Sequence, residues 1–219
     1  MFGSSAKLFL DAGWCTDMFD PDPACEAGLN QLVQQYPGKA RMFRQMVSHE
    51  AENMLIFYQA QMGFSSLDPS PYSKLQQVLF VRSVHLRDAM REHKIPQPDI
   101  IHIDAEGSDL QVFAGYELHA MPPKCVMLHF DTKFPLQSAD KVEAAVSGIR
   151  QLGYDSLIFS YEDKASAPDR DYRLTKLDFD LVPKEPNSKG TIIFFRREDS
   201  LFPATLLRVL QSFLPMTER

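Results

Sequence analysis

Apolar and polar positions follow two spacings along this chain, and these spacings predict its helices and strands. Helical spacing, with apolar residues three and four apart, predicts helices at residues 6–12, 24–36, 86–93, 138–152 and 204–214, the clearest being 138–152 with Ser138 as its cap. Short apolar runs bounded by turn residues predict strands at residues 15–19, 40–47, 54–59, 78–84, 100–103, 124–130, 154–160 and 191–196, with a further short strand near 177–182. The polar stretches 61–74 and 161–188 are expected to be mainly loops.

This order of elements predicts an α/β fold. Strands and helices alternate through most of the chain, and the last two clear strands, 154–160 and 191–196, come late. Such alternation is typical of a doubly wound sheet, here expected to carry an antiparallel hairpin at its edge. The length of 219 residues suits a single domain over residues 1–219.

Composition excludes several classes of partner. The formal net charge of −6 and the scattered basic residues argue against binding to a nucleic-acid backbone. No apolar segment has the length of about 18–20 residues needed to span a membrane, and the first residues lack the features of a signal peptide. Cys15, Cys25 and Cys125 form no zinc-binding spacing, and so sparse a set fits a reducing compartment. We therefore expect a cytoplasmic protein.

Two acidic strand ends are the chemically informative features. The apolar run 100–103 is followed by Asp104, Glu106 and Gly107, where a glycine permits a sharp bend into the next helix. Ligands of parallel α/β sheets bind at the carboxyl ends of the strands, so these groups are candidates for a pocket. The alternative is that they only form a strand exit and a helix start.

The other acidic end follows strand 15–19. A carboxylate at Asp20 can accept hydrogen bonds from both hydroxyls of a ribose, and Pro21 and Pro23 stiffen the turn that holds it. Asp20 and Asp22 could equally serve only as caps of helix 24–36, because aspartate is common at that position.

Taken together, the short motifs resemble the FkbM-type family of S-adenosylmethionine-dependent methyltransferases. In that family, a strand ending F-E-P-x-P precedes a loop with S-S-L, a segment like L-D-D and then K-I-D-x-E-G-x-E-x-x-V-L-x-G. The matching segments here are Phe19-Asp20-Pro21-Asp22-Pro23, Ser65-Ser66-Leu67, Leu86-Arg87-Asp88 and His102-Ile103-Asp104-Ala105-Glu106-Gly107, the last continued by Asp109, Val112-Phe113 and Gly115. The resemblance extends over nearly the whole chain.

The resemblance implies a Rossmann-like class I methyltransferase sheet with a C-terminal antiparallel hairpin, S-adenosyl-L-methionine as cofactor, and O-methylation of a small molecule or sugar. It places Asp20 at the ribose, with Pro21 and Asp22 beside it. Val47 and Ser48 would lie beside the adenine. By the same resemblance Asp104, Glu106 and Gly107 would border the reaction pocket, with Asp104 and Gly107 also touching the cofactor.

Catalytic candidates under this interpretation are Asp104, Glu106 and His129. A general base is needed only for an acceptor hydroxyl of high pKa, and His102 and His129 both stand at or near strand ends. A hydrogen-bonded core histidine is the alternative for each. No histidine spacing indicates a metal site.

Three features depart from the family pattern. The first strand and the glycine-rich D-x-G-A-x-x-G loop should precede residues 4–12, so we expect the chain to be truncated at its N-terminus. His102 replaces a lysine, and Leu128-His129-Phe130-Asp131 stands where a glutamate and a histidine are common.

Two other functions remain open at this stage: a non-catalytic binding domain with the same fold, and an NAD-type dehydrogenase, whose cofactor also suits an acid after the second strand.

Overall fold

The computed structural model describes residues 4–50, 53–60, 65–67, 74–163, 172–178 and 188–198. It is a mixed α/β structure with several sheets, consistent with a Rossmann-like fold. Its residues form two compact units, one made of residues 1–96, 105–117 and 134–136 and the other of 97–104, 118–133 and 137–219. No helix among the described residues is long and apolar enough to cross a membrane.

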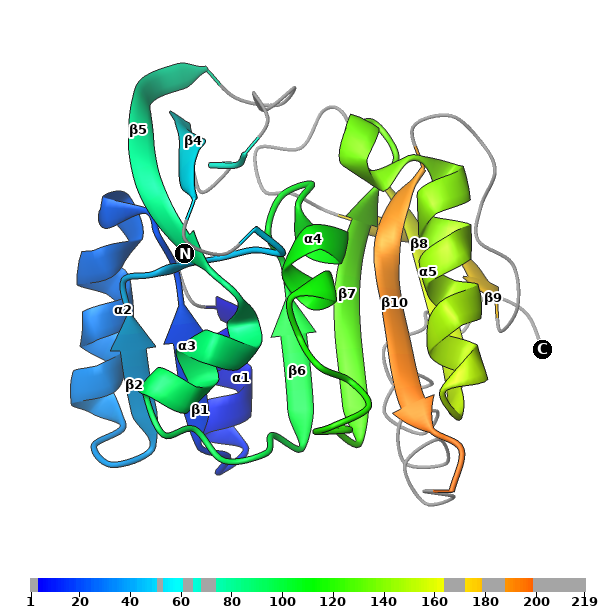
Figure 1. Ribbon diagram of the computed structural model, residues 1–219, viewed down its shortest axis with the longest axis horizontal. Coiled ribbons are helices and arrows are strands. Elements are labelled where there is room, and N and C mark those ends of the chain that lie inside the picture. The colour runs from blue at the N-terminus through cyan, green and yellow to red at the C-terminus, as the bar shows by residue number, and fades with distance from the viewer. Residues whose placement is uncertain are drawn as a thin grey trace. The chain divides into compact units, whose positions relative to one another are not determined.

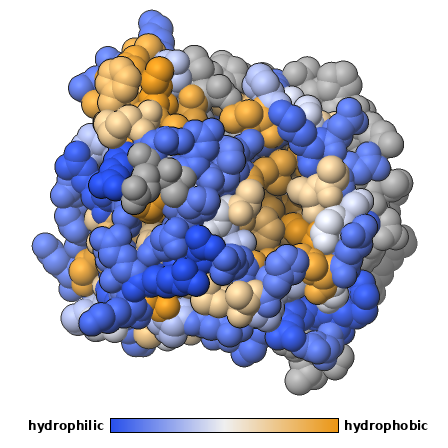
Figure 2. All heavy atoms as spheres, viewed as in Figure 1, coloured by the Kyte–Doolittle hydropathy of each residue, from blue (hydrophilic) through white to orange (hydrophobic). Residues whose placement is uncertain are grey.

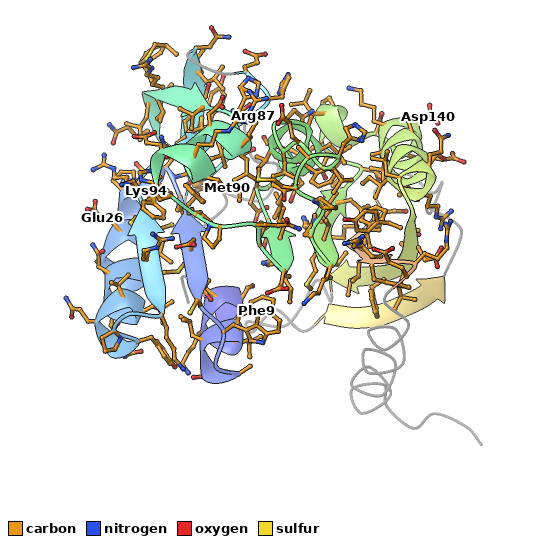
Figure 3. The ribbon with its side chains drawn as sticks, turned by 60° about the horizontal axis from the view of Figure 1, so that its bottom comes forward. Phe9, Glu26, Arg87, Met90, Lys94 and Asp140 are labelled. Carbon is orange, nitrogen blue, oxygen red and sulfur yellow. The ribbon has the colours of Figure 1, made fainter. Side chains whose placement is uncertain are left out.

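The first unit begins with a parallel strand pair and two helices. Strand β1 (Thr16–Phe19) pairs with β2 (Ala40–Phe43), and helices α1 (Ser4–Asp11) and α2 (Pro23–Gln35) accompany them (Figure 1). Apolar residues from all four elements form one buried cluster: Leu10, Met18, Cys25, Leu29, Leu32 and Ala40. Glu26 lies on the outer side of α2 in Figure 3, so the helix has one apolar and one polar face.

The predicted strand 40–47 is broken in two. After β2 the chain turns, and the short strand β3 (Met46–Val47) pairs with a different neighbour, β5 (Leu75–Val84). β5 also pairs antiparallel with β4 (Met54–Ala60), which gives a second, three-stranded sheet in this unit. The apolar pattern of 40–47 predicted extended backbone correctly but not the change of partner, which depends on contacts far along the chain.

Two short helices complete the first unit. Helix α3 (Leu86–Glu92) follows β5, and helix α4 (Asp109–Ala114) follows the D-x-E-G motif. Arg87, labelled on α3 in Figure 3, donates its backbone N–H to the carbonyl of Gly115, and its guanidinium pairs with Glu117. These contacts attach the two helices to each other.

The second unit is built on a five-stranded sheet in the order β6-β7-β10-β8-β9. Its strands are β6 (Ile100–Ile103), β7 (Cys125–Asp131), β8 (Tyr154–Asp163), β9 (Tyr172–Asp178) and β10 (Lys189–Arg196). Only β6 and β7 run parallel. Helix α5 (Ala139–Gln151) packs on β8 (Figure 1). The short 3-10 helix η2 (Pro135–Gln137), whose first two residues belong to the first unit, precedes α5 in the chain.

The last described strand does not lie at an edge of this sheet. β10 pairs antiparallel with β7 on one side and with β8 on the other, so Ile192 stands opposite both Leu128 and Ile158. The edge beyond β8 is formed by β9, which covers 172–178. It contains the first two residues of the predicted short strand near 177–182, and residues 179–182 lie outside the described part of the chain. Gly190 is required within β10, because a Cβ there would lie 1.8 Å from the carbonyl oxygen of Phe159.

Two further predictions have separate outcomes. Ser138 occupies the N-cap position of α5, but its side chain makes no capping hydrogen bond; its carbonyl accepts the N–H of Val142. The predicted helix 204–214 and most of the loop 61–74 lie outside the described residues.

Candidate functional site

The turn after β1 carries two carboxylates, Asp20 and Asp22, whose environments differ. Asp22 is almost fully buried, with 2% of its surface exposed. Its carboxylate accepts hydrogen bonds from the Ala24 N–H at 2.8 Å, from Gln59 Nε2 at 2.7 Å and from Ser65 Oγ at 2.5 Å. Asp22 is therefore both the cap of α2 and a buried anion whose oxygens already have donors within the protein.

Asp20 has a different environment at the carboxyl end of β1. Its side chain is half-buried, and its Oδ1 accepts the N–H of Asp22 at 2.9 Å. Burial raises the pKa of Asp20 above its ordinary value, while the Asp22 N–H and the Cys25 thiol oppose that rise and the charge of Asp22 adds to it. A half-exposed carboxylate with one main-chain donor retains acceptor capacity for a ligand's hydroxyl groups.

The turn after β6 contains two consecutive residues in the left-handed region. Glu106 has φ +43° and Gly107 has φ +95°. A side chain at Gly107 would meet the ring of Phe134 at 2.4 Å, so glycine is needed both for its φ and for the space. A left-handed non-glycine residue costs roughly 1–3 kcal/mol, and such strain concentrates at functional sites.

Asp109 holds this turn from the helix side. It is completely buried, and its carboxylate accepts the N–H of Ala105 at 3.0 Å and the N–H of Gly107 at 3.3 Å. The sequence left Glu106 as part of a helix start and gave Asp109 no role, whereas Asp109, the first residue of α4, holds the turn that precedes the helix. The position of Asp109 in the first helical turn was the available signal.

The S-S-L segment connects the two acidic motifs within the first unit. Ser65 donates to Asp22, and its neighbour Ser66 donates its hydroxyl to the carbonyl of Glu106. The sequence motif contains these serines but indicates no role for them, and no pattern in the sequence points to Gln59. The structure therefore brings the turn 20–23 and the turn 105–107 to one short segment.

Ser48, proposed from sequence to lie beside an adenine, is also tied to the D-x-E-G region. It follows β3, is fully buried, and donates its N–H to the carbonyl of Val84 at 2.9 Å. Its own carbonyl lies so close to Gly115 that a Cβ on that glycine would be 2.5 Å away. Val47 precedes it, half-buried, at the end of β3. Glycine at 115 thus permits close packing of the two segments.

In the second unit, the end of β6 places an acid beside a histidine. Asp104 is exposed, and its Oδ1 lies 3.9 Å from Nδ1 of His129 on β7, whose side chain is 17% exposed. His102 shares this face two residues before Asp104 and reaches the surface; desolvation by the surrounding chain lowers its pKa, opposed by Asp104 and reinforced by His129. His129 can accept a proton, and the neighbouring carboxylate would stabilise the resulting imidazolium.

Comparison with known proteins gives one family. The family model described as "Methyltransferase FkbM domain" matches residues 2–155, which include all of the candidate site residues above. Among curated proteins, no sequence matches the chain.

Proposed function

Because this chain belongs to the family of FkbM methyltransferase domains, we propose that it transfers a methyl group from S-adenosyl-L-methionine to a hydroxyl oxygen of a small molecule or sugar. Membership of the family points to methyltransferase activity. The donor, the oxygen acceptor and the residue roles are our proposals.

The environment of Asp20 carries the proposal for the donor. Its carboxylate stands at the end of a parallel strand, half-buried, with a rigid proline-containing turn behind it. This chemistry fits the vicinal hydroxyls of a ribose, because each carboxylate oxygen can accept one of them. Asp22, whose oxygens are already hydrogen-bonded, acts on the ligand only by fixing the turn. Val47 and Ser48 would contact the base.

The residues around the D-x-E-G turn are assigned to the reacting end of the cofactor and to the acceptor. When bound, S-adenosylmethionine supplies an electrophilic methyl group on a positively charged sulfur. We assign to Glu106 and Gly107 the positioning of the acceptor, because a fixed turn can hold a reactant in line for displacement. His129 takes the proton of the acceptor hydroxyl at Nε2, while Asp104 beside Nδ1 stabilises the imidazolium.

Calorimetry with S-adenosylmethionine tests the donor assignment. The wild-type chain should bind it, and Asp20→Ala should weaken binding by about 1–3 kcal/mol, typical for the loss of a charged hydrogen-bonding group. The control is Asp17→Ala on the same strand, whose carboxylate pairs with Arg41 instead; its affinity should match wild type. Equal affinity in Asp20→Ala and wild type would disprove the role of Asp20.

A further inference from the structure

Ser65 and Ser66 are anchored on the end of strand β4. The N–H of Tyr58 donates to the carbonyl of Ser66 at 2.8 Å, and the N–H of Ser66 returns a bond to the carbonyl of Tyr58 at 3.1 Å. The N–H of Ala60 donates to Ser65 Oγ at 3.1 Å. These hydrogen bonds to β4 fix the positions of both serines and thus of their hydroxyl groups.

The Ser65 hydroxyl acts on the donor side of the proposed site. It is one of three groups that donate to the buried Asp22 carboxylate, and the Asp22 N–H in turn donates to Asp20. A buried carboxylate is costly unless donors surround it, so loss of one donor would loosen this turn. Ser65 therefore reaches Asp20 through Asp22.

The Ser66 hydroxyl acts on the other turn. Ser66 is 2% exposed and donates to the carbonyl of Glu106, the residue with φ +43°. Asp109 holds the amides on either side of Glu106, and Ser66 holds its carbonyl. A conformation costing roughly 1–3 kcal/mol persists only where the surroundings fix it from several directions.

We infer that Ser65 and Ser66 are positioning residues, one for the ribose-binding carboxylate Asp20 and the other for the Glu106 turn that borders the reacting end of the cofactor. This inference rests on the proposed function. Two adjacent residues thus position the two halves of the cofactor site. Substitution of each serine should therefore weaken binding to a different half.

Two ligands separate the two halves: adenosine, which has the ribose and base alone, and S-adenosylhomocysteine, which also has the sulfur-containing chain. By calorimetry, Ser65→Ala should weaken both about 10-fold, and Ser65→Thr, which keeps the hydroxyl, should restore most of the loss. Ser66→Ala should weaken S-adenosylhomocysteine about 10-fold and leave adenosine within about twofold of wild type.

Ser83→Ala is the matched control. Ser83 is a fully buried serine on β5, and its hydroxyl donates to the carbonyls of Glu50 and Asn53 rather than to a residue of either turn. It should lose comparable packing and leave both affinities unchanged. If Ser65→Ala and Ser66→Ala behave like Ser83→Ala while wild type binds, the positioning roles are wrong and the proposed function stands.

Hydrogen exchange gives a second measurement that does not depend on binding. Ser66→Ala should accelerate exchange of the Ala105 and Gly107 amides at least several-fold over wild type and Ser83→Ala. Unchanged exchange overturns the role of Ser66. If wild type binds neither ligand, the proposed function fails. Accelerated exchange in Ser66→Ala would then still show that the Ser66 hydroxyl stabilises the Glu106 turn.

Discussion

Asp20 and Asp22 stand two residues apart on one rigid turn, yet their surroundings give them different chemistry. The buried Asp22 accepts hydrogen bonds from three parts of the chain, and these bonds stabilise the turn in which it lies. Asp20 retains exposed surface and a single main-chain donor. Residue type alone does not separate these roles, because both aspartates satisfy the local preference for a helix cap.

The raised pKa of Asp20 leads to a prediction about pH. The ionised carboxylate is the form that accepts ribose hydroxyls, so protonation competes with binding. Because burial raises this pKa above the ordinary 3.8, affinity for S-adenosylmethionine should begin to fall at a higher pH than for an exposed aspartate as the solution is acidified.

Calorimetry between about pH 4.5 and 8 measures this effect, with Asp20→Asn as the control. The asparagine variant cannot titrate at this position, so its weaker binding should show only the ligand's own ionisation. Parallel pH profiles for the two proteins would contradict the assignment of Asp20.

At the scale of the element, strand β10 organises the second unit. Its residues Ile192, Ile193, Phe194 and Phe195 are all buried, because the strand lies between β7 and β8 and both faces of the sheet are covered at this point. Such a continuous apolar run is typical of an interior strand rather than an edge. The sequence predicted an antiparallel hairpin of the two late strands but did not say which of them would lie nearer the middle of the sheet.

Phenylalanine residues at two positions test this difference. Phe194→Ala should lower the free energy of unfolding by about 3–5 kcal/mol, because Phe194 has no exposed surface and its removal leaves a cavity. Phe80→Ala, on β5, should change it by no more than about 0.5 kcal/mol, because that side chain is 69% exposed.

Urea unfolding of both variants and wild type gives the comparison. It is valid when the slope of the unfolding free energy against urea concentration is the same in all three proteins. Similar losses in the two variants would show that β10 is not a packed interior strand.

At the scale of the whole molecule, the net charge opposes association between copies, whereas one exposed apolar face favours it. The formal net charge of −6 at pH 7 keeps copies apart. On one face of the β4–β5 hairpin, however, Met54, Ile56, Val78 and Phe80 are all exposed, with Ile56 directly opposite Phe80. Figure 2 shows apolar surface over this hairpin.

We expect solubility to be lowest near the sequence pI of about 5.5, where charge repulsion vanishes and this apolar face promotes association. The variant Ile56→Thr/Phe80→Ser should reduce turbidity there. Leu8→Ser is the control, because Leu8 is 72% exposed on α1, outside this face. Light scattering across pH 4.5–7.5 measures the effect, and equal improvement by Leu8→Ser would disprove a special role for the hairpin.

The sequence by itself determined the elements and the family. Periodicity predicted helix α5 and strand β6 within one or two residues of their observed ends, since an amphipathic stripe and a short apolar run are local properties. The short motifs also sufficed to identify the FkbM family, which the family comparison confirms.

Only the tertiary structure decided which residues meet. Gln59 reaches Asp22 across 37 residues, Ser66 reaches Glu106 across 40, and β10 lies between strands that precede it by at least 26 residues (Asp163 to Lys189). Such contacts depend on strand register and on how loops close, and neither is encoded in the spacing of apolar residues. For that reason the sequence could name Asp20 and Asp22 as a pair of candidates, while the fold buries Asp22 among three hydrogen-bond donors and leaves Asp20 half-exposed.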